Sequence, residues 1–158
     1  MQKGFTLIEL VIAMTIFFVM MALAIPNLLG SRSQAEINSA VPVLISDIKN
    51  QQLKAMLGAT EGRATTDYYG VHFETNTYTL FHGLSYNPVD TSNAIVSLSG
   101  TLKFGSIAFS NAQIIFQKGN GEVVGFNSVA NTVVLIDPSN NESRTITLNS
   151  YGTITGVQ

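Results

Sequence analysis

The chain has 158 residues, of which only 11% are charged, and its formal net charge is −2 at pH 7. This length suits one small domain plus an N-terminal anchor, and the weak negative charge disfavours a broad phosphate-binding surface for nucleic acid. The sequence contains no cysteine, which excludes disulfides, thiol catalysis and cysteine-ligated metal sites.

The first predicted element is an apolar helix from Phe5 to Leu29. It would be about 37 Å long, enough to cross a hydrocarbon core of about 30 Å with some tilt. Glu9 is the only charged residue in this segment. An unpaired carboxylate inside lipid costs about 2.5–3.5 kcal/mol by insertion scales, so a partner cation is expected. The segment itself contains none.

The whole sequence resembles a type IV pilin-like precursor through Met-Gln-Lys-Gly at 1–4, Phe-Thr-Leu-Ile-Glu-Leu at 5–10 and Ala-Ile-Pro at 24–26. The resemblance implies that a prepilin peptidase cuts between Gly4 and Phe5 and that Phe5 is then N-methylated. It also implies that Glu9 meets the charged terminus of a neighbouring subunit. Cutting would create the missing amine, so assembly would bury an ion pair rather than a lone charge.

The resemblance also implies the partners of the chain. They are the prepilin peptidase and N-methyltransferase, other pilin or pseudopilin subunits, an inner-membrane assembly platform, and membrane lipid before assembly. The expected location is the bacterial inner membrane, crossed once with the β-domain on the periplasmic or outer side, and then the filament. No cofactor is expected.

Two simpler interpretations of the apolar segment are a secretory signal peptide and a plain membrane anchor. Ala22-Leu23-Ala24 fits a signal-peptidase site. However, Glu9 interrupts what should be an uncharged core, and Lys3 is the only basic residue before it. A plain anchor does not explain the acid either.

Beyond Pro26 the pattern becomes one-sided, with Ile37, Val41, Leu44 and Ile48 at helical spacing. This periodicity predicts an amphipathic helix from about Ser33 to Leu57 whose apolar stripe covers a β-sheet, and Gly58 is a suitable helix end.

Pro26 and Pro42 fall inside the predicted helix, where each removes a backbone hydrogen bond and clashes with the preceding turn. Two kinks or one short melted stretch are therefore expected. The resemblance implies that the region around Pro26 can lose helicity in the assembled filament, which Gly30 and Ser31 would ease; the alternative is a static bend.

From Tyr68 onward, period-two runs rich in β-branched and aromatic residues predict antiparallel strands. The expected strands are Tyr68–Phe73, Thr77–Phe81, Asn93–Leu98, Leu102–Phe109, Gln113–Lys118, Glu122–Phe126, Thr132–Ile136, Arg144–Leu148 and Thr153–Val157. The predicted fold class is α+β, with a long N-terminal helix packed on an antiparallel β-sheet domain, as in the pilin fold. Its expected parts are a leader at 1–4, a membrane and assembly helix at 5–29, an amphipathic helix at 30–58, and a β-rich domain at 59–158.

The C-terminal half also resembles the minor-subunit branch of the GspH or FimT type. The resemblance lies in Ile-Ile-Phe-Gln-Lys-Gly-Asn-Gly at 114–121 and Ile-Thr-Leu-Asn-Ser-Tyr-Gly-Thr-Ile at 146–154. It implies a subunit at or near a filament tip rather than the bulk subunit.

Residue patterns for catalysis or metal binding are weak. His72 and His82 lie on opposite arms of the first predicted hairpin, but its register pairs His72 with Thr79 and His82 with Tyr69, so they should not share a metal. Ser85 lacks the glycine pattern of a nucleophile elbow. The oxygen-rich loop of Asp137, Asn140, Asn141 and Glu142 suits calcium, although ordinary turn chemistry explains the same residues.

The sequence therefore predicts a non-enzymatic structural subunit, a minor pilin or a pseudopilin, of a type IV pilus or a type II secretion pseudopilus. Two alternatives remain. One is a pilin-like receptor for DNA uptake or surface adhesion, although no basic run supports DNA as a partner. The other is a membrane-anchored enzyme that would depend on His72 or His82.

Overall fold

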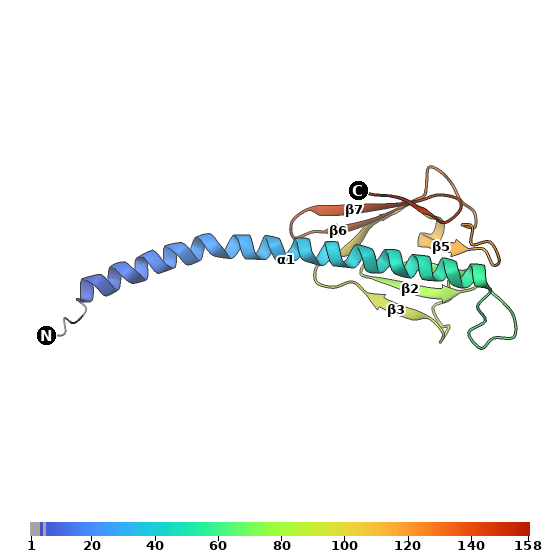
Figure 1. Ribbon diagram of the computed structural model, residues 1–158, viewed down its shortest axis with the longest axis horizontal. Helices are drawn as coiled ribbons and strands as arrows, with labels where there is room; N and C mark the ends of the chain where they lie inside the picture. The colour runs from blue at the N-terminus through green and yellow to red at the C-terminus, as the bar shows by residue number, and fades with distance from the viewer. Residues whose placement is uncertain (1–3, 5) are drawn as a thin grey trace.

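The structure is a computed structural model that describes Gly4 and residues 6–158, without the side chains of residues 23–33. A single helix, α1 (Leu7–Leu57), accounts for 51 of these residues. Its first half projects away from a β-rich domain and its second half packs against that domain (Figure 1). The α+β class predicted from the sequence is confirmed.

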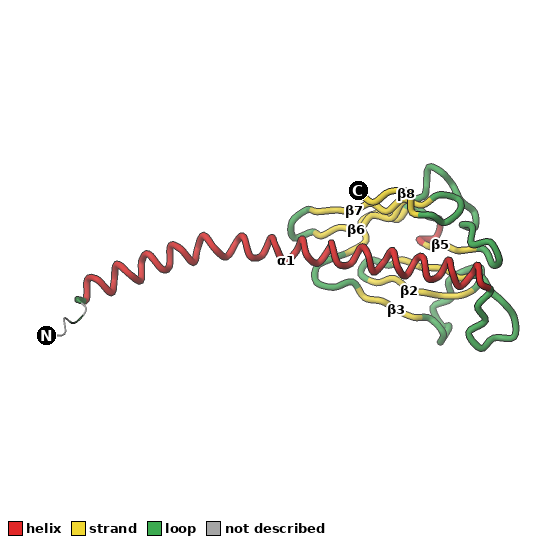
Figure 2. Tube along the Cα trace, viewed as in Figure 1, coloured by secondary structure: helices red, strands yellow, loops and turns green. Residues whose placement is uncertain are grey.

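The long helix is continuous through both prolines (Figure 2). The projecting half curves, but the melted stretch that the sequence allowed is not seen. Proline fixes φ near the helical value, so Pro26 and Pro42 can each remain helical while one backbone hydrogen bond is lost. A gentle bend is the outcome that the structure supports.

The described strands form two four-stranded antiparallel sheets, where the sequence predicted one. The first sheet has the order β3-β2-β1-β5 and the second has the order β4-β6-β7-β8. Their bounds are β1 Tyr69–Phe73, β2 Thr77–His82, β3 Ala94–Ser97, β4 Lys103–Ile107, β5 Gln113–Phe116, β6 Thr132–Asp137, β7 Glu142–Leu148 and β8 Ile154–Val157. A short 3-10 turn, η1 (Ser110–Ala112), precedes β5.

The predicted strand Glu122–Phe126 is wrong. Only one isolated bridge, between Phe116 and Val123, joins this segment to β5. Gly121 and Gly125 have φ angles of 72° and 65°, outside the region that an extended strand requires. The amide of Val123 instead donates to the carbonyl of Ser150 at 2.9 Å, which ties this segment to the loop between β7 and β8.

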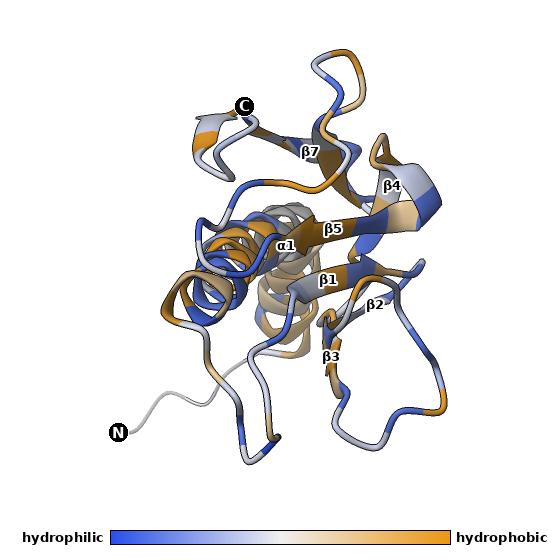
Figure 3. Cartoon of the chain, turned by 90° about the vertical axis from the view of Figure 1, so that its right-hand side faces the viewer, coloured by the Kyte–Doolittle hydropathy of each residue, from blue (hydrophilic) through white to orange (hydrophobic). Residues whose placement is uncertain are grey.

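The apolar stripe of α1 is buried as predicted, with Ile37, Leu44 and Ile48 at 0% exposure and Val41 at 6%. The helix contacts β1 and β5 of one sheet and β6 and β7 of the other. Figure 3 shows this arrangement from the domain end, with α1 beside β1 and β5. Burying one such side chain is worth about 1.5–3 kcal/mol relative to leaving it in water, so the stripe holds the two sheets and the helix together.

The helix end is secured by backbone and amide hydrogen bonds. Gly58 has a left-handed conformation (φ 62°), and the amides of Gly58 and Ala59 donate to the carbonyls of Ala55 and Lys54, as in a Schellman motif. Just before it, Gln52 Nε2 donates to the carbonyls of Gly121 and Tyr151 at 3.0 and 2.6 Å. The helix therefore anchors two loops of the domain.

Candidate processing and assembly site

The start of α1 is closed by a reciprocal capping box. Thr6 is the N-cap, with φ −81° and ψ 150°, and its Oγ1 accepts a hydrogen bond from the amide of Glu9 at 3.3 Å. In return, Glu9 Oε2 accepts from the amide of Thr6 at 3.1 Å and from its hydroxyl at 2.9 Å. Two backbone donors that the helix leaves unsatisfied are thereby bonded.

The capping box turns the Glu9 carboxylate back toward the beginning of the chain. Within the described residues, Glu9 makes no ion pair. Phe5, where the sequence predicts cleavage, methylation and the new amine, lies outside the described residues. The predicted Glu9 partner therefore stays a prediction.

Gly4, the predicted last residue of the leader, is exposed. A Cβ atom built at Gly4 would meet no atom within 4 Å. Packing in the described chain therefore does not require glycine at this position, and a larger side chain could be accommodated in the free subunit.

The projecting half of α1 exposes apolar side chains on all faces. Every described side chain from Leu7 to Ala22 is exposed, and Glu9 is the only charged one. The large apolar residues in this segment are Leu7, Ile8, Leu10, Val11, Ile12, Met14, Ile16, Phe17, Phe18, Val19, Met20 and Met21. Such a large exposed apolar surface marks a contact with another protein or with a membrane.

A membrane-spanning helix is not confirmed. Among the residues that the structure describes, no helical stretch combines the length and the apolar character needed to cross a bilayer.

The two histidines lie apart in the register that the sequence predicted, with Tyr69 opposite His82 and His72 opposite Thr79. The ring of His72 stacks on Tyr86 with centroids 4.1 Å apart, and burial lowers the pKa of this histidine. No group of three or more His, Asp or Glu residues suited to a metal ion occurs in the described part of the chain.

His82 lies between two carboxylates. Its Nδ1 is 2.9 Å from Asp67 Oδ2 and its Nε2 is 3.2 Å from Asp90 Oδ2. These contacts connect β2 to the segment before β1 and to the loop before β3. They attach both of these segments to β2.

The oxygen-rich loop is occupied by turn hydrogen bonds. Asp137 is fully buried, and its Oδ1 accepts from the hydroxyls of Thr101 and Ser139, both at 2.7 Å. Asn140 Oδ1 accepts from the amide of Glu142 at 3.0 Å, and Glu142 Oε1 accepts from Gln34 Nε2 at 2.7 Å. These bonds hold the loop and attach it to α1, as the turn interpretation expects, while Glu142 Oε2 is buried without a hydrogen-bond partner among the described residues.

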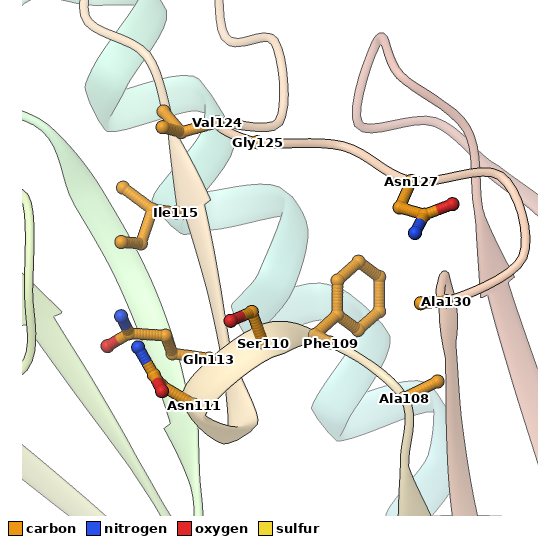
Figure 4. Close-up of a pocket in the computed structure, with 10 residues that line it drawn as sticks. All are labelled: Ala108, Phe109, Ser110, Asn111, Gln113, Ile115, Val124, Gly125, Asn127 and Ala130. Carbon is orange, nitrogen blue, oxygen red and sulfur yellow. The ribbon is translucent and has the colours of Figure 1, made fainter.

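A cavity of about 350 Å³ lies between η1, β5 and the loop that leads to β6 (Figure 4). Asn111 and Ala112, at its edge, have φ angles of 53° and 51°, although neither is glycine. Such a left-handed conformation costs roughly 1–2 kcal/mol for a residue such as Ala112, whereas asparagine adopts it more readily. No sequence pattern predicted this cavity, because its walls come from segments that meet only in the folded domain.

Sequence reasoning missed Thr6 as a partner of Glu9. The signal was present, since Thr-x-x-Glu directly before an apolar run is the pattern of a capping box.

The comparison with protein families gave one match: residues 1–25 match the prokaryotic N-terminal methylation motif. No curated protein and no solved structure matches the chain. The matched residues contain Gly4, Thr6 and Glu9, and thus the capping box and the start of the exposed apolar helix. The motif indicates a type IV pilin-like precursor that is processed at its N-terminus.

Proposed function

We propose that this chain is a minor subunit, of the GspH or FimT type, of a type IV pilus or a type II secretion pseudopilus. The observation that carries the proposal is the projecting half of α1, which is apolar on all faces and has one carboxylate in its first turn. An apolar surface of this size is unfavourable in water, so a monomeric soluble domain would not expose it. A filament subunit needs it for contact with its neighbours.

In this proposal the precursor crosses the inner membrane once through residues 5–29, with the β-rich domain on the outer side. The proposed membrane crossing is supported by the mostly apolar sequence of residues 5–29. The structure describes the side chains of only part of this segment. The assembly platform then extracts the mature subunit from lipid. Lipid contacts are replaced by contacts with the exposed helices of other subunits, so the apolar surface stays out of water throughout.

Glu9 would set the axial position of each incoming subunit. The processed terminus at Phe5 of one subunit supplies the cation, and Glu9 of its neighbour supplies the anion. Burying either charge alone is costly, whereas a paired and hydrogen-bonded arrangement offsets the desolvation cost. Thr6 supports this role because it holds the carboxylate in place before assembly.

Gly4 would be required by the peptidase and not by the fold. A side chain at Gly4 has open space around it in the free chain. A peptidase that accepts an extended, narrow backbone at the cut would be blocked by a bulky residue there. Gly4→Leu should therefore leave folding unchanged and prevent processing.

The test is the intact mass of the full-length protein from cells with and without a prepilin peptidase. We expect loss of residues 1–4 and gain of one methyl group only when the peptidase is present, with Gly4→Leu remaining uncut and Gly4→Ala processed. An unchanged wild-type mass in both strains would refute the proposal and leave a plain anchored protein. A cut after Ala24 would refute it in favour of a secreted domain.

The proposal assigns no catalytic step to the β-rich domain. The ring of His72 stacks on Tyr86, and His82 contacts the carboxylates of Asp67 and Asp90. Pilus and pseudopilus use the same N-terminal machinery, so cross-linking of the mature chain to the subunits of each filament would distinguish them.

A further inference from the structure

We propose that the cavity beside β5 binds a neutral oligosaccharide. The cavity is lined by Ala108, Phe109, Ser110, Asn111, Gln113, Ile115, Val124, Gly125, Asn127 and Ala130. Its walls come from three separated segments, namely the end of β4 with η1, the strand β5, and the loop before β6 (Figure 4). It lies in the β-rich domain, whereas the processing and assembly site lies in residues 4–9.

The polar lining is entirely uncharged. Asn127 Oδ1 accepts from the amide of Val129, and Gln113 Oε1 accepts from the amide of Tyr86, each at 3.1 Å. Among the described residues, the NH₂ groups of both side chains have no acceptor, and the side chains of Ser110 and Asn111 have no hydrogen-bond partner. The side-chain amides of Gln113 and Asn127 are thus each held by one hydrogen bond to the oxygen, and their NH₂ groups remain available as donors to a ligand.

These groups suit a ligand rich in hydroxyls. An amide NH₂ donates to a hydroxyl oxygen, and an amide carbonyl or a serine hydroxyl accepts the hydroxyl proton. The lining contains no Lys or Arg to bind a phosphate or carboxylate, and no Asp or Glu to bind a cation. The chemistry therefore favours an uncharged ligand over nucleic acid or an acidic polymer.

The apolar wall complements the C–H surface of a sugar ring. Ile115 and Val124 lie on one side of the cavity and Phe109 on another, and Asn127 lies near Phe109, further along the loop that carries Val124 (Figure 4). A volume of about 350 Å³ lies at the small end of the range for ligand pockets, which suits one or two sugar units rather than a long chain.

The local backbone indicates a preformed site. Asn111 and Ala112 hold left-handed conformations, and residues in such conformations cluster at ligand clamps and other functional sites. Each of two segments of the wall has its own backbone hydrogen bond. In η1 the amide of Ala112 donates to the carbonyl of Phe109 at 3.1 Å, and in the loop before β6 the amide of Ala130 donates to the carbonyl of Asn127 at 3.0 Å. Little ordering would be needed on binding.

The test uses the full-length isotope-labelled protein in a detergent without a sugar headgroup, titrated with cellotriose and N-acetylchitotriose and observed by NMR. We expect saturable shifts at residues 108–113 and 124–130 with at least one of the two. Asn127→Ala should weaken binding about tenfold. Asn111→Gly should do the same while keeping the left-handed backbone, because glycine adopts it without strain. Ser128→Ala, in the same loop but outside the lining, is the matched control.

No saturable shift with either sugar at millimolar concentration would overturn the proposal. So would binding that both Asn variants leave intact, since the cavity would then not be the site. Trigalacturonate, an acidic trisaccharide, and a neutral tripeptide are the competing probes. Tighter binding of the trisaccharide would overturn the neutral ligand, and tighter binding of the tripeptide would overturn the saccharide. None of these outcomes bears on cleavage after Gly4, so the sugar titration and the intact-mass measurement test the two proposals independently.

Discussion

The hydroxyl and the backbone amide of Thr6 both donate to the same carboxylate oxygen of Glu9, at 2.9 and 3.1 Å. Glu9 therefore has a structural partner in its own chain in addition to the external cation proposed for it. The two roles can be separated, because the cap needs a hydrogen-bond acceptor and the external pair needs a charge. Glutamine supplies the first without the second.

Glu9→Gln should preserve the helix start and still impair assembly. Glutamine at the third helical position completes a capping box as glutamate does, whereas alanine does not. We expect Glu9→Gln and Glu9→Ala both to insert in the membrane and both to be depleted from sheared filaments. The measurement is the fraction of subunit in the filament pool by immunoblot. If Glu9→Gln assembled normally and only Glu9→Ala failed, the cap would be the functional feature and the charge pairing would be wrong.

Leu44→Ala should destabilise the domain by about 2–5 kcal/mol, because it leaves a cavity where α1 meets the two sheets. Leu44 is fully buried, while its neighbour Val43 is 54% exposed and makes a suitable control. Val43→Ala should change stability by less than about 0.5 kcal/mol. Urea unfolding of the full-length protein in detergent, followed by circular dichroism, measures both. Equal effects of the two substitutions would contradict the assigned face of the helix.

Gly70→Ala should be destabilising even though it adds only one methyl group. A Cβ atom at Gly70 would lie 2.6 Å from the carbonyl oxygen of Ile114 on β5 and 2.6 Å from the ring of Phe81 on β2. Overpacking of this kind costs about 1–3 kcal/mol. Gly156, where the nearest atom to a new Cβ is 4.0 Å away, is the control. The urea midpoint of unfolding should be lower for Gly70→Ala than for Gly156→Ala. A Gly70→Ala variant with the wild-type midpoint would argue against the β1–β5 packing.

Tyr78 should make stability depend on pH in the alkaline range. Burial, together with the hydrogen bond that its hydroxyl donates to Asp47 Oδ2, raises the pKa of the Tyr78 phenol. The folded chain therefore keeps a proton that the unfolded chain loses above about pH 10. The contribution of the protonated Tyr78 phenol to the free energy of unfolding is complete below about pH 10 and decreases as the pH rises above it.

Tyr78→Phe should cost about 1–2 kcal/mol at neutral pH through the lost hydrogen bond, and should reduce the alkaline loss of stability. Burial also raises the pKa of Tyr69, so part of that loss will persist in the variant. Tyr151, which is 66% exposed, provides the control for loss of a hydroxyl, and Tyr151→Phe should change stability at neutral pH by less than about 0.5 kcal/mol. An alkaline slope identical in wild type and Tyr78→Phe would refute this role for Tyr78.

Most of the secondary structure could be predicted because its signals are local. The spacing of Ile37, Val41, Leu44 and Ile48 predicted a buried helix face, and Gly58 predicted its end. The strand at Glu122–Phe126 was mispredicted for a nonlocal reason. Its β-forming residues lie between glycines, and the amide of Val123 bonds to Ser150, which is distant in sequence and close only in the folded chain.

The same division applies to the functional features. The sequence alone determined the N-terminal features, because the motif, the charge and the apolar length are properties of consecutive residues and the Thr6–Glu9 cap needs only one helical turn. Only the tertiary structure decided that the strands form two sheets, that α1 contacts both, and that η1, β5 and the loop before β6 together line a cavity. These features depend on strand pairing between distant segments. Pairing is chosen by the packing of the whole domain, which a local pattern does not encode.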